Sequence, residues 1–495
     1  KDYNHPSVIM YSTGNEVAET AQKKGIALTG DMTNYLHSLD STRPVTCGIN
    51  IFFNFLSSIG LGVYSDDKAE KSAGNAEKNA AQAAGKNEKK VVKSGEKTVN
   101  KATENGKKGL GSTKPEKKKK PVGSEFYNTL ACLVGDYFMK CGATLYPCDL
   151  RTKDAYANMD IAGYNYGIFR YKHDLKKYPN RLILGSETAS TVSSRGVYKF
   201  PVEDKKGAKY EDHQCSSYDV EVCPWSNIPD EDFALADDHH WTIGQFVWTG
   251  FDYLGEPSPY DTDSWPNHSS MFGIIDLASL PKDRYYLYRS VWNKEAETLH
   301  ILPHWTWPGR EGEVTPVFVY TNYPTAELFI NGKSYGKQSK NNSSLKNRYR
   351  LMWMDTKYEP GEVKVVAYDK NGKAVAEKVV RTAGKPHHIE LVSNRNELTA
   401  DGKDLAYVTV KVVDKDGNLC PTDNRQINFS VKGTGKYRAA ANGDPTNLEQ
   451  FHLPKMHAFN GMLTAILQAG ETAGEIVFTA KANGVKAGNI RIQTK

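Results

Sequence analysis

"VIMYSTGNE", residues 8–16, is an apolar run that passes through small residues and ends on a carboxylate. A second run, "RLILGSE" at residues 181–187, has the same form and ends on Glu187. Short apolar runs of this kind are typical of buried strands. In a parallel barrel, functional side chains follow the carboxyl ends of such strands. The two stretches therefore predict that Glu16 and Glu187 belong to one barrel-type site.

Three further stretches have the composition of buried strands: "PVTCGI" (44–49), "MDIAGYNY" (159–166) and "QFVWTGFDYL" (245–254). Residues 18–40 place apolar side chains at helical spacing between the first two strands. Apolar strands that alternate with helices or long loops indicate a parallel sheet buried on both faces. We interpret residues 1–298 as part of a (β/α)₈ TIM barrel, with five recognisable strands.

Residues 66–124 interrupt this order with a Lys-rich stretch that contains no aromatic residue. Between Lys68 and Lys120 there are sixteen Lys and six Glu, so this stretch alone has a net charge of +10. The whole chain has a net charge of only +6. The rest of the chain is therefore net acidic. We interpret the stretch as a flexible insertion that cannot form a core. A basic arm for nucleic acid or an anionic surface is the alternative, and we predict no nucleic-acid partner.

After residue 298 the sequence changes to short alternating strands separated by turn residues. Asn331-Gly332 and Asn371-Gly372 lie between alternating runs, which is the strongest short-range signal of a hairpin. Each block has the length of an immunoglobulin-like sandwich. A chain of 495 residues is long enough for about three domains. We predict two immunoglobulin-like β-sandwich domains, at 299–384 and 385–495.

The paired carboxylates suggest a chemistry. A glycosidase needs one carboxyl group to protonate the leaving oxygen and another to attack or stabilise the sugar cation. Tyr164, Tyr166 and Trp248 end two other strands and could contact a sugar. Either Glu taken alone reads better as a solvated carboxylate or a helix cap, but the two together favour glycosidic bond cleavage.

Several motifs resemble glycoside hydrolase family 2. "NHPSVIMYSTGNE" (4–16) is similar to the acid/base strand of that family, and "RLILGSETAS" (181–190) to its nucleophile strand. "DIAGYNYG" (160–167) is similar to its sixth strand. "FVWTGFDYLGEPSPY" (246–260) and "MFGIIDLASLPKDRYYLYRSVW" (271–292) resemble the closing section of its β-galactosidase-like members. The resemblance covers about 1–65 and 125–298 and extends into the β domains.

The resemblance implies a role for each residue of the predicted site. Glu16 would be the general acid/base and Glu187 the nucleophile of a retaining mechanism, with carboxyl groups about 5–5.5 Å apart. Asn15 would bind the sugar 2-hydroxyl, and Trp248 would form the floor of the sugar subsite. Tyr166, or else Tyr164, would donate to the nucleophile. Asn165 and Asp252 would contact the sugar or support its contacts, or be structural. His5 precedes the strand and is expected to be structural.

The resemblance also implies what this chain would act on. We expect hydrolysis of a terminal β-galactoside or of an oligosaccharide that carries one, with a β-glucuronidase or another family 2 β-glycosidase as the alternative. The family places a jelly-roll domain, an immunoglobulin-like domain and three barrel strands before the acid/base motif. We therefore expect a C-terminal portion whose own activity is uncertain, with an inactive fragment or carbohydrate-binding module as the remaining alternative.

Composition adds few further expectations. The seven Cys include no C-x-x-C pair, so we predict no metal site and no cofactor. Cys215 and Cys223 could pair in an oxidising compartment, but we expect free thiols. No apolar run is long enough to predict a membrane span. A homo-oligomer is left open, and a periplasmic or other extracytoplasmic location is compatible with the sequence.

Overall fold

The computed structural model describes residues 5–58, 129–130, 133, 144–239, 241–261 and 263–495. The chain forms two compact units, the first made of 1–126 and 140–181, the second of 127–139 and 182–495. The division falls inside the segment predicted as the barrel. The whole of the predicted Lys-rich insertion, residues 66–124, and the stretch 125–128 after it lie outside the described residues.

The first unit contains three parallel strands: β1 (Tyr11–Asn15), β2 (Val45–Ile49) and β3 (Ile161–Asn165). Strand β2 pairs with β1 on one side and with β3 on the other. Every residue of β2 and β3 is buried, as expected for strands covered on both faces. The other elements are η1 (Ala18–Ala21), α1 (Lys23–Leu39), α2 (Ile51–Ser58), α6 (Tyr146–Ala157), η2 (Ile168–Arg170) and α7 (Tyr171–Lys177). The three parallel strands predicted in this unit are confirmed. The bounds of the strands predicted at 44–49 and 159–166 are right to within one or two residues. The strand predicted at 8–16 begins later, at Tyr11.

Helix α1 is confirmed, but its buried positions are small. Gly25, Thr29 and Thr33 are its buried residues, whereas Leu28 and Tyr35 are 57% and 65% exposed. A Cβ on Gly25 would lie 2.0 Å from the backbone oxygen of Glu19, so η1 and α1 approach too closely for a side chain there. The apolar spacing seen in the sequence therefore marks the outer face of this helix.

The second unit begins with strand β4 (Ile183–Thr188), which pairs in parallel with β7 (Thr242–Val247). The predicted strand at 245–254 is too long at its carboxyl end. Beyond Trp248 the chain bridges instead to a returning segment, through Phe251 with Ile275 and Leu254 with Ser269. The remaining elements before the β domains are β5 (Lys205–Lys206), β6 (Glu221–Val222), α8 (Pro229–Asp238) and α9 (Asp283–Trp292).

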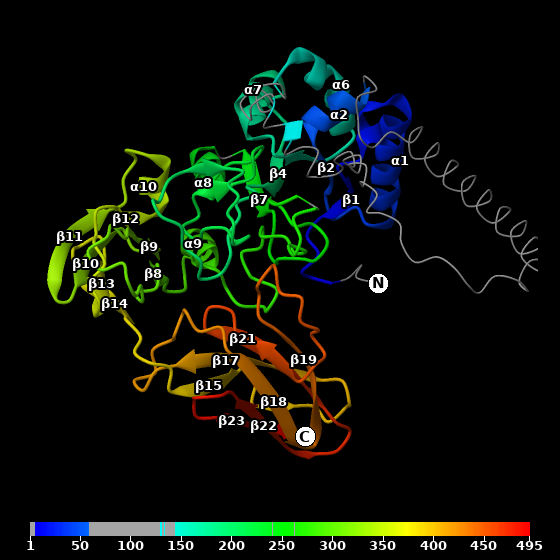
Figure 1. Cartoon of the computed structure of the whole chain (residues 1–495). Helices are drawn as coiled ribbons and strands as arrows, with labels where there is room; N and C mark the ends of the chain where they lie inside the picture. Colours follow the sequence, from blue (N-terminus) through cyan, green and yellow to red (C-terminus); the bar gives the residue numbers. More distant parts are fainter. Residues whose placement is uncertain (1–4, 59–128, 131–132, 134–143, 240, 262) are drawn as a thin grey trace, which may run out of the picture. The chain divides into compact units, whose positions relative to one another are not determined.

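The rest of the second unit consists of two pairs of sheets (Figure 1). The first pair contains β8 (Leu299–Leu302), β9 (Val317–Thr321), β10 (Thr325–Ile330), β11 (Lys333–Ser339), β12 (Leu351–Trp353), β13 (Glu362–Tyr368) and β14 (Ala374–Arg381), with α10 (Leu345–Tyr349). The second contains β15 (His388–Ser393), β16 (Glu397–Leu398), β17 (Leu405–Val413), β18 (Gln426–Gly433), β19 (Gly435–Ala441), β20 (Lys455–His457), β21 (Met462–Ala469), β22 (Gly474–Lys481) and β23 (Gly488–Thr494).

Each pair of sheets encloses an apolar core. In the first, Val319 of one sheet packs in the same cluster as Leu328 and Val365 of the other. In the second, Val408 and Leu463 share a cluster with Phe478. Buried and more exposed residues alternate along these strands, which explains the alternation of apolar and polar residues from which the sequence predicted them.

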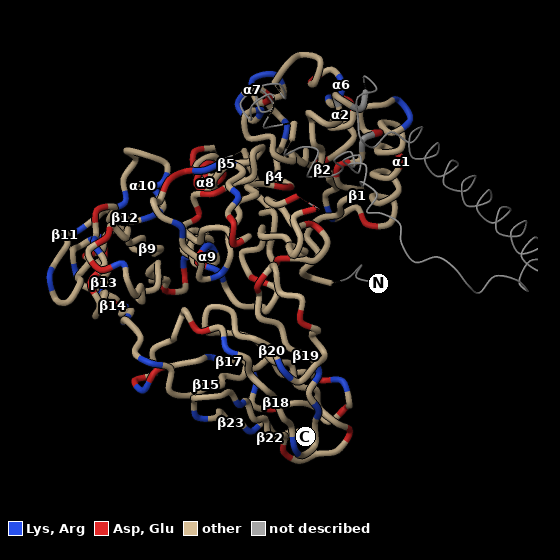
Figure 2. Tube along the Cα trace, viewed as in Figure 1, with Lys and Arg blue, Asp and Glu red and all other residues tan. Residues whose placement is uncertain are grey.

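The hairpin between β10 and β11 turns at the predicted Asn331-Gly332. Both residues have positive φ, 50° and 79°, and Ile330 faces Lys333 across the turn. Asn and Gly tolerate this conformation better than other residues, which is why the dipeptide predicts the turn. Charged residues of both signs are interspersed along the described elements (Figure 2).

A buried polar cluster joins the segment before β6 to the first β domain. Asp219 is fully buried, and its carboxylate accepts a hydrogen bond from the Tyr320 hydroxyl at 2.9 Å. The guanidinium of Arg350 pairs with the buried carboxylate of Asp230 and also donates to the Asp219 carbonyl at 3.2 Å. Burial raises the pKa of the Asp219 carboxyl to about 6, although Arg284 and Arg350 lie nearby.

The substitution Asp219→Asn tests this burial. The folded chain holds the Asp219 proton more tightly than the unfolded chain, since its pKa rises from 3.8 to about 6. Wild-type stability should therefore fall as the pH rises from about 4 to about 6. The free energy of unfolding of the variant, relative to wild type, should increase by about 2–3 kcal/mol over that window. Urea unfolding across the pH range measures it.

The exposed Asp355→Asn variant is the control and should show no such trend. A difference between Asp219→Asn and wild type that stays constant from about pH 4 to about pH 7 would contradict the burial argument.

Candidate active site

Glu16 directly follows β1, and its backbone leaves the strand in an unusual conformation. Its amide N–H donates to the Gly48 carbonyl at 2.8 Å, which continues the β1–β2 pairing by one residue. Its φ is 53°, in the left-handed region that non-glycine residues rarely adopt. Such backbone conformations cluster at functional sites because the surrounding structure must hold them in place.

Two amide side chains converge on the Glu16 carboxylate. The side-chain amides of Asn50 and Asn165 donate to Glu16 Oε1 at 3.0 and 3.1 Å. The Asn165 amide also donates to Asn15 Oδ1 at 2.8 Å. These residues follow or end β2, β3 and β1, so the parallel strands deliver all of them to one edge. Hydrogen bonds to a carboxylate are stronger than those between neutral groups, and here they fix its orientation.

The structure thus brings together three of the predicted residues, Asn15, Glu16 and Asn165. Asn50 was missed. Asn50 directly follows the strand "VTCGI", just as Glu16 directly follows β1. This position after a buried strand was the only sign in the sequence that Asn50 belongs to the site. Asn50 and Asn165 are 7% and 2% exposed, and buried amides at strand ends need partners.

The two predicted tyrosines differ sharply. Tyr164 is fully buried; its hydroxyl donates to Asp174 and accepts from Arg181 Nη1 at 3.0 Å. Burial, followed by the nearby Asp174 charge, raises the pKa of Tyr164 well above its usual value. Tyr166 follows β3 with φ of 52° and is partly exposed, at the position that Glu16 takes after β1. Of the two, Tyr166 has the better placement for contact with a ligand.

In the second unit, Glu187 and Trp248 lie on neighbouring strand ends. Glu187 is partly exposed near the end of β4, and the Trp248 amide N–H donates to the Thr188 carbonyl at 3.1 Å. The Tyr253 ring stands edge-on to the Trp248 indole, with centroids 5.8 Å apart. Trp248 is therefore tied through its backbone to the strand that carries Glu187, and its ring packs against Tyr253.

Asp252 has charged and backbone partners inside the chain. Its Oδ2 lies 2.7 Å from Lys282 Nζ, and its Oδ1 accepts from the Gly273 amide at 2.8 Å. Asp252 is 7% exposed and Lys282 is 1% exposed. Burial raises the pKa of Asp252 to about 6 and lowers that of Lys282. These contacts favour the structural role among those left open by the sequence.

Known domains match most of this chain. Residues 1–113 match the domain described as "Glycosyl hydrolases family 2, TIM barrel domain", and 389–491 match "Glycoside hydrolase family 2 C-terminal domain 5". Residues 312–376 match a domain of unknown function. The β-galactosidase BoGH2A of Bacteroides ovatus is 40% identical over 347 residues, which is 68% of this chain and 39% of that protein.

The chain belongs to glycoside hydrolase family 2.

Two other proteins extend the comparison. A β-glucuronidase of Formosa agariphila is 23% identical over 64% of this chain and 31% of that protein. The crystal structure of a β-glycosidase from Bacteroides vulgatus superposes with a TM-score of 0.68 at 25% identity, covering 99% of this chain and 51% of the other. The chain spans about half the length of its relatives or less, and the relatives carry different activity names.

The family 2 motif at the start of the chain also places His5. Its Nδ1 accepts from the Ser7 amide at 3.2 Å, and its carbonyl accepts from Arg43 Nη2 at 3.3 Å. Both contacts shape the entry into β1, in line with the structural role expected for this residue.

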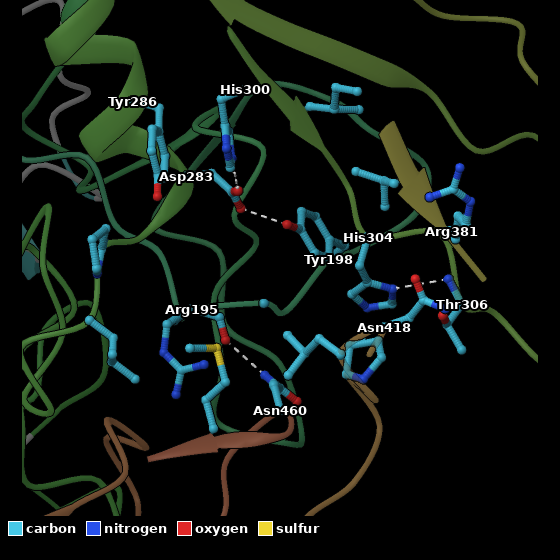
Figure 3. Close-up of a pocket in the computed structure, with 18 of the residues that line it drawn as sticks. Arg195, Tyr198, Asp283, Tyr286, His300, His304, Thr306, Arg381, Asn418 and Asn460 are labelled. Atoms are coloured by element: carbon cyan, nitrogen blue, oxygen red, sulfur yellow. Dashed lines mark hydrogen bonds and ion pairs between the residues drawn. The ribbon is translucent and has the colours of Figure 1, made fainter. Parts of the chain in front are cut away.

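The second unit of the family 2 chain contains a cavity of about 400 Å³. Asp283 accepts from the Tyr198 hydroxyl and contacts His300 Nε2, both at 2.6 Å (Figure 3). On another wall, Asn460 Nδ2 donates to the Arg195 carbonyl at 2.7 Å. None of the eight predicted site residues lines this cavity.

The guanidinium of Arg195 links the segment after β4 to the second β domain. Its Nε donates to Asp276 at 2.6 Å, and its Nη2 donates to the carbonyls of Asn442 and Phe459 at 2.8 and 3.0 Å. Nearby, the His268 amide donates to the Pro445 carbonyl at 3.2 Å. Loops of the C-terminal domain therefore support the segments that follow β4 and β7.

Among the residues that the structure describes, Cys215 and Cys223 are buried free thiols, as expected. In the same residues there is no cluster of His, Cys, Asp or Glu suited to a metal ion. No helix within the described ranges combines the length and apolar character needed to cross a bilayer.

Lys282→Met tests the role of Asp252. The variant leaves the Asp252 carboxyl buried without its cation, so we expect the free energy of unfolding to fall by about 3–5 kcal/mol. Urea unfolding measures the change. The exposed pair of Lys495 and Glu397 offers a control: Lys495→Met should cost less than about 1 kcal/mol. Unchanged stability in Lys282→Met would instead show that Asp252 does not depend on this pair.

Proposed function

We propose that this chain carries the catalytic residues of a retaining β-glycosidase that acts on terminal β-galactosides. The observation that carries the proposal is the Glu16 carboxylate, held by two amides at the ends of three parallel strands. The similarity to the β-galactosidase BoGH2A favours galactosides. We further propose that the two β domains are immunoglobulin-like accessory modules.

Glu16 would act first as an acid. Its carboxyl group gives a proton to the glycosidic oxygen while Glu187 attacks the anomeric carbon, so the bond to the leaving group breaks and a glycosyl ester forms. Glu16, now a carboxylate, removes a proton from water, which attacks the same carbon and releases Glu187. The Asn50 and Asn165 amides would hold Glu16 in the orientation that both steps need.

The neighbouring side chains would bind the sugar. Asn15, which is bonded to Asn165, would contact the 2-hydroxyl, where hydrogen bonds strengthen in the transition state. Trp248 would offer its ring to the apolar face of the sugar. Tyr166 would contact the nucleophile, since the Tyr164 hydroxyl is bound to Asp174 and Arg181.

A β-glucuronidase is the second candidate, because a relative bears that name. A panel of aryl β-glycosides separates the two activities on the wild-type chain. A chain that binds galactose but cleaves no aryl glycoside would support a non-catalytic binding module instead.

Glu16→Gln and Glu187→Gln test the assignment of the two carboxylates. We expect Glu16→Gln to lower kcat/KM about 10²–10⁴-fold on a phenyl galactoside, which needs a proton donor. The loss should be much smaller for a dinitrophenyl galactoside, whose leaving group needs no proton. Glu187→Gln should abolish turnover of both substrates while sugar binding persists. Equal losses of both substrates in Glu16→Gln would contradict its role as acid.

Asn50→Ala tests the amide cradle. Removing one hydrogen bond to a charged group costs about 1.5–3 kcal/mol, so kcat/KM should fall on the order of 10–100-fold. Circular dichroism and thermal unfolding establish that the variant folds. The exposed Asn371→Ala is the matched control and should keep wild-type kinetics. A fully active Asn50→Ala would show that the cradle does not contribute to catalysis.

A further inference from the structure

A cluster of buried charges lies between helices α6 and α7 of the first unit. Arg170 is fully buried, and its guanidinium pairs with Asp149 of α6 and, through Nε at 2.7 Å, with Asp174 of α7. Both carboxylates are buried. Arg181 Nη1 donates to Asp174 Oδ2 at 3.0 Å. These four residues, called the charge cluster below, tie the two helices together.

Tyr164 connects strand β3 to the charge cluster. Its hydroxyl donates to Asp174 Oδ2 and accepts from Arg181 Nη1 at 3.0 Å. Burial, with the Asp174 charge as the next cause, raises the pKa of Tyr164 well above its usual value, so the hydroxyl keeps its proton at neutral pH. The ring stacks on Tyr156, with centroids 4.7 Å apart, and stands edge-on to Tyr171 at 5.6 Å. Hydrogen bonds and ring contacts together fix Tyr164 against the helices.

Asn165, the next residue along β3, contacts the proposed acid/base. Neighbouring side chains of a strand point to opposite faces, so Asn165 points away from the helices that hold Tyr164. Its amide donates to Glu16 Oε1 at 3.1 Å and to Asn15 Oδ1 at 2.8 Å. The pairing of β2 with β3 extends as far as Ile49 and Tyr164, so Asn165 lies directly beyond it. The last β3 residue that pairs with β2 is therefore the residue that the charge cluster holds.

We propose that Tyr164 is a positioning residue whose bond to the charge cluster holds the Asn165 amide against the Glu16 carboxylate. The catalytic importance of this contact rests on the proposed function, in which Glu16 is the acid and the base. An amide that donates to a carboxylate favours its ionised form. The contact therefore affects how readily Glu16 gives up its proton, as well as its orientation. Asp174 and Arg181 act through Tyr164, and neither needs to touch a ligand.

A second tyrosine hydroxyl reaches the charge cluster from outside β3. Tyr178 follows α7, and its hydroxyl donates to Asp149 Oδ2 at 3.0 Å. Lys177 pairs with the same carboxylate, and His173 Nδ1 lies 2.9 Å from Asp174 Oδ1. Tyr178 thus gives the cluster a hydroxyl, as the anchor on β3 does, but it does not belong to the strand that carries the amide. It offers a matched control.

Tyr164→Phe removes the anchoring hydroxyl and keeps the ring. The titration midpoint of the Glu16 carboxyl is measured by ¹³C NMR on the whole chain with labelled Glu, and its signal is the one absent from Glu16→Gln. Asn165→Ala, which removes the amide, should raise this midpoint by about one to two pH units. Tyr164→Phe should raise it in the same direction, by about 0.5–1 pH unit. Circular dichroism and thermal unfolding establish that the variants fold.

The double variant separates positioning from a general structural role. Because Tyr164 acts through Asn165, Tyr164→Phe should not move the midpoint further in the Asn165→Ala background. Lower thermal stability with an unmoved midpoint, or equal effects in the two backgrounds, would overturn the inference. Arg181→Met removes the other partner of the Tyr164 hydroxyl and should also raise the midpoint, which keeps the test decisive if Tyr164→Phe does not fold.

Tyr178→Phe is the matched control, since it removes a hydroxyl from the same charge cluster. Its Glu16 midpoint should equal that of wild type. A midpoint that moves equally in Tyr178→Phe and Tyr164→Phe would show that any disturbance of the cluster has this effect, and it would contradict anchoring through β3.

Failure of the inference and failure of the proposed function give different results, because the titration needs no turnover. A chain that cleaves no aryl glycoside, but whose midpoint responds to Tyr164→Phe, loses the proposed function and keeps the inference. A chain that cleaves aryl galactoside, but whose midpoint does not respond, keeps the function and loses the inference. In an active chain the alkaline limb of kcat/KM should move to higher pH with the midpoint, since the acid form of Glu16 persists.

Discussion

Parallel pairing of β1, β2 and β3 is the constraint on which the first unit depends. Backbone hydrogen bonds fix the register of the three strands, so the residues that follow them arrive at one edge. Glu16 and Tyr166 then turn away from the strands with positive φ, while Asn50 and Asn165 supply amides to the same place. A polar side chain at this edge has a defined position because it directly follows or ends a strand of the sheet, and β2 and β3 are fully buried.

In the second unit, charged side chains rather than a set of paired strands hold the predicted site residues in place. Here β4 and β7 pair in parallel, and an irregular segment follows each strand. Asp252, Lys282 and Arg195 place charges inside these segments and satisfy backbone groups that no sheet pairs. Polar anchors, rather than regular secondary structure, thus define the surroundings of Glu187 and Trp248.

Much of this arrangement could be predicted from the sequence, because apolar runs and Asn-Gly turns act locally. Val45–Ile49 and the Asn331-Gly332 hairpin need no knowledge of distant residues. The Glu16 carboxylate was also evident, since it ends a strand. Asn50 could not be recognised from the sequence, because its role depends on a hydrogen bond to Glu16, which is distant in the chain. The carboxyl end of β7 was misjudged for a similar reason: residues after Trp248 have strand-like composition, but their partners come from 269–275.

The contacts of Arg195 limit how freely the C-terminal domain can be exchanged among related proteins. Two of its acceptors are backbone carbonyls, at Asn442 and Phe459, so the requirement falls on loop shape and not on side-chain identity. If the C-terminal domain were replaced by one with loops of another length, the buried Arg195 guanidinium would lose these acceptors. Leaving a buried charge without hydrogen-bond partners would strongly lower the stability of the fold. The sequence of the C-terminal domain can therefore drift widely, while the lengths of the loops around 442 and 459 are expected to stay constant.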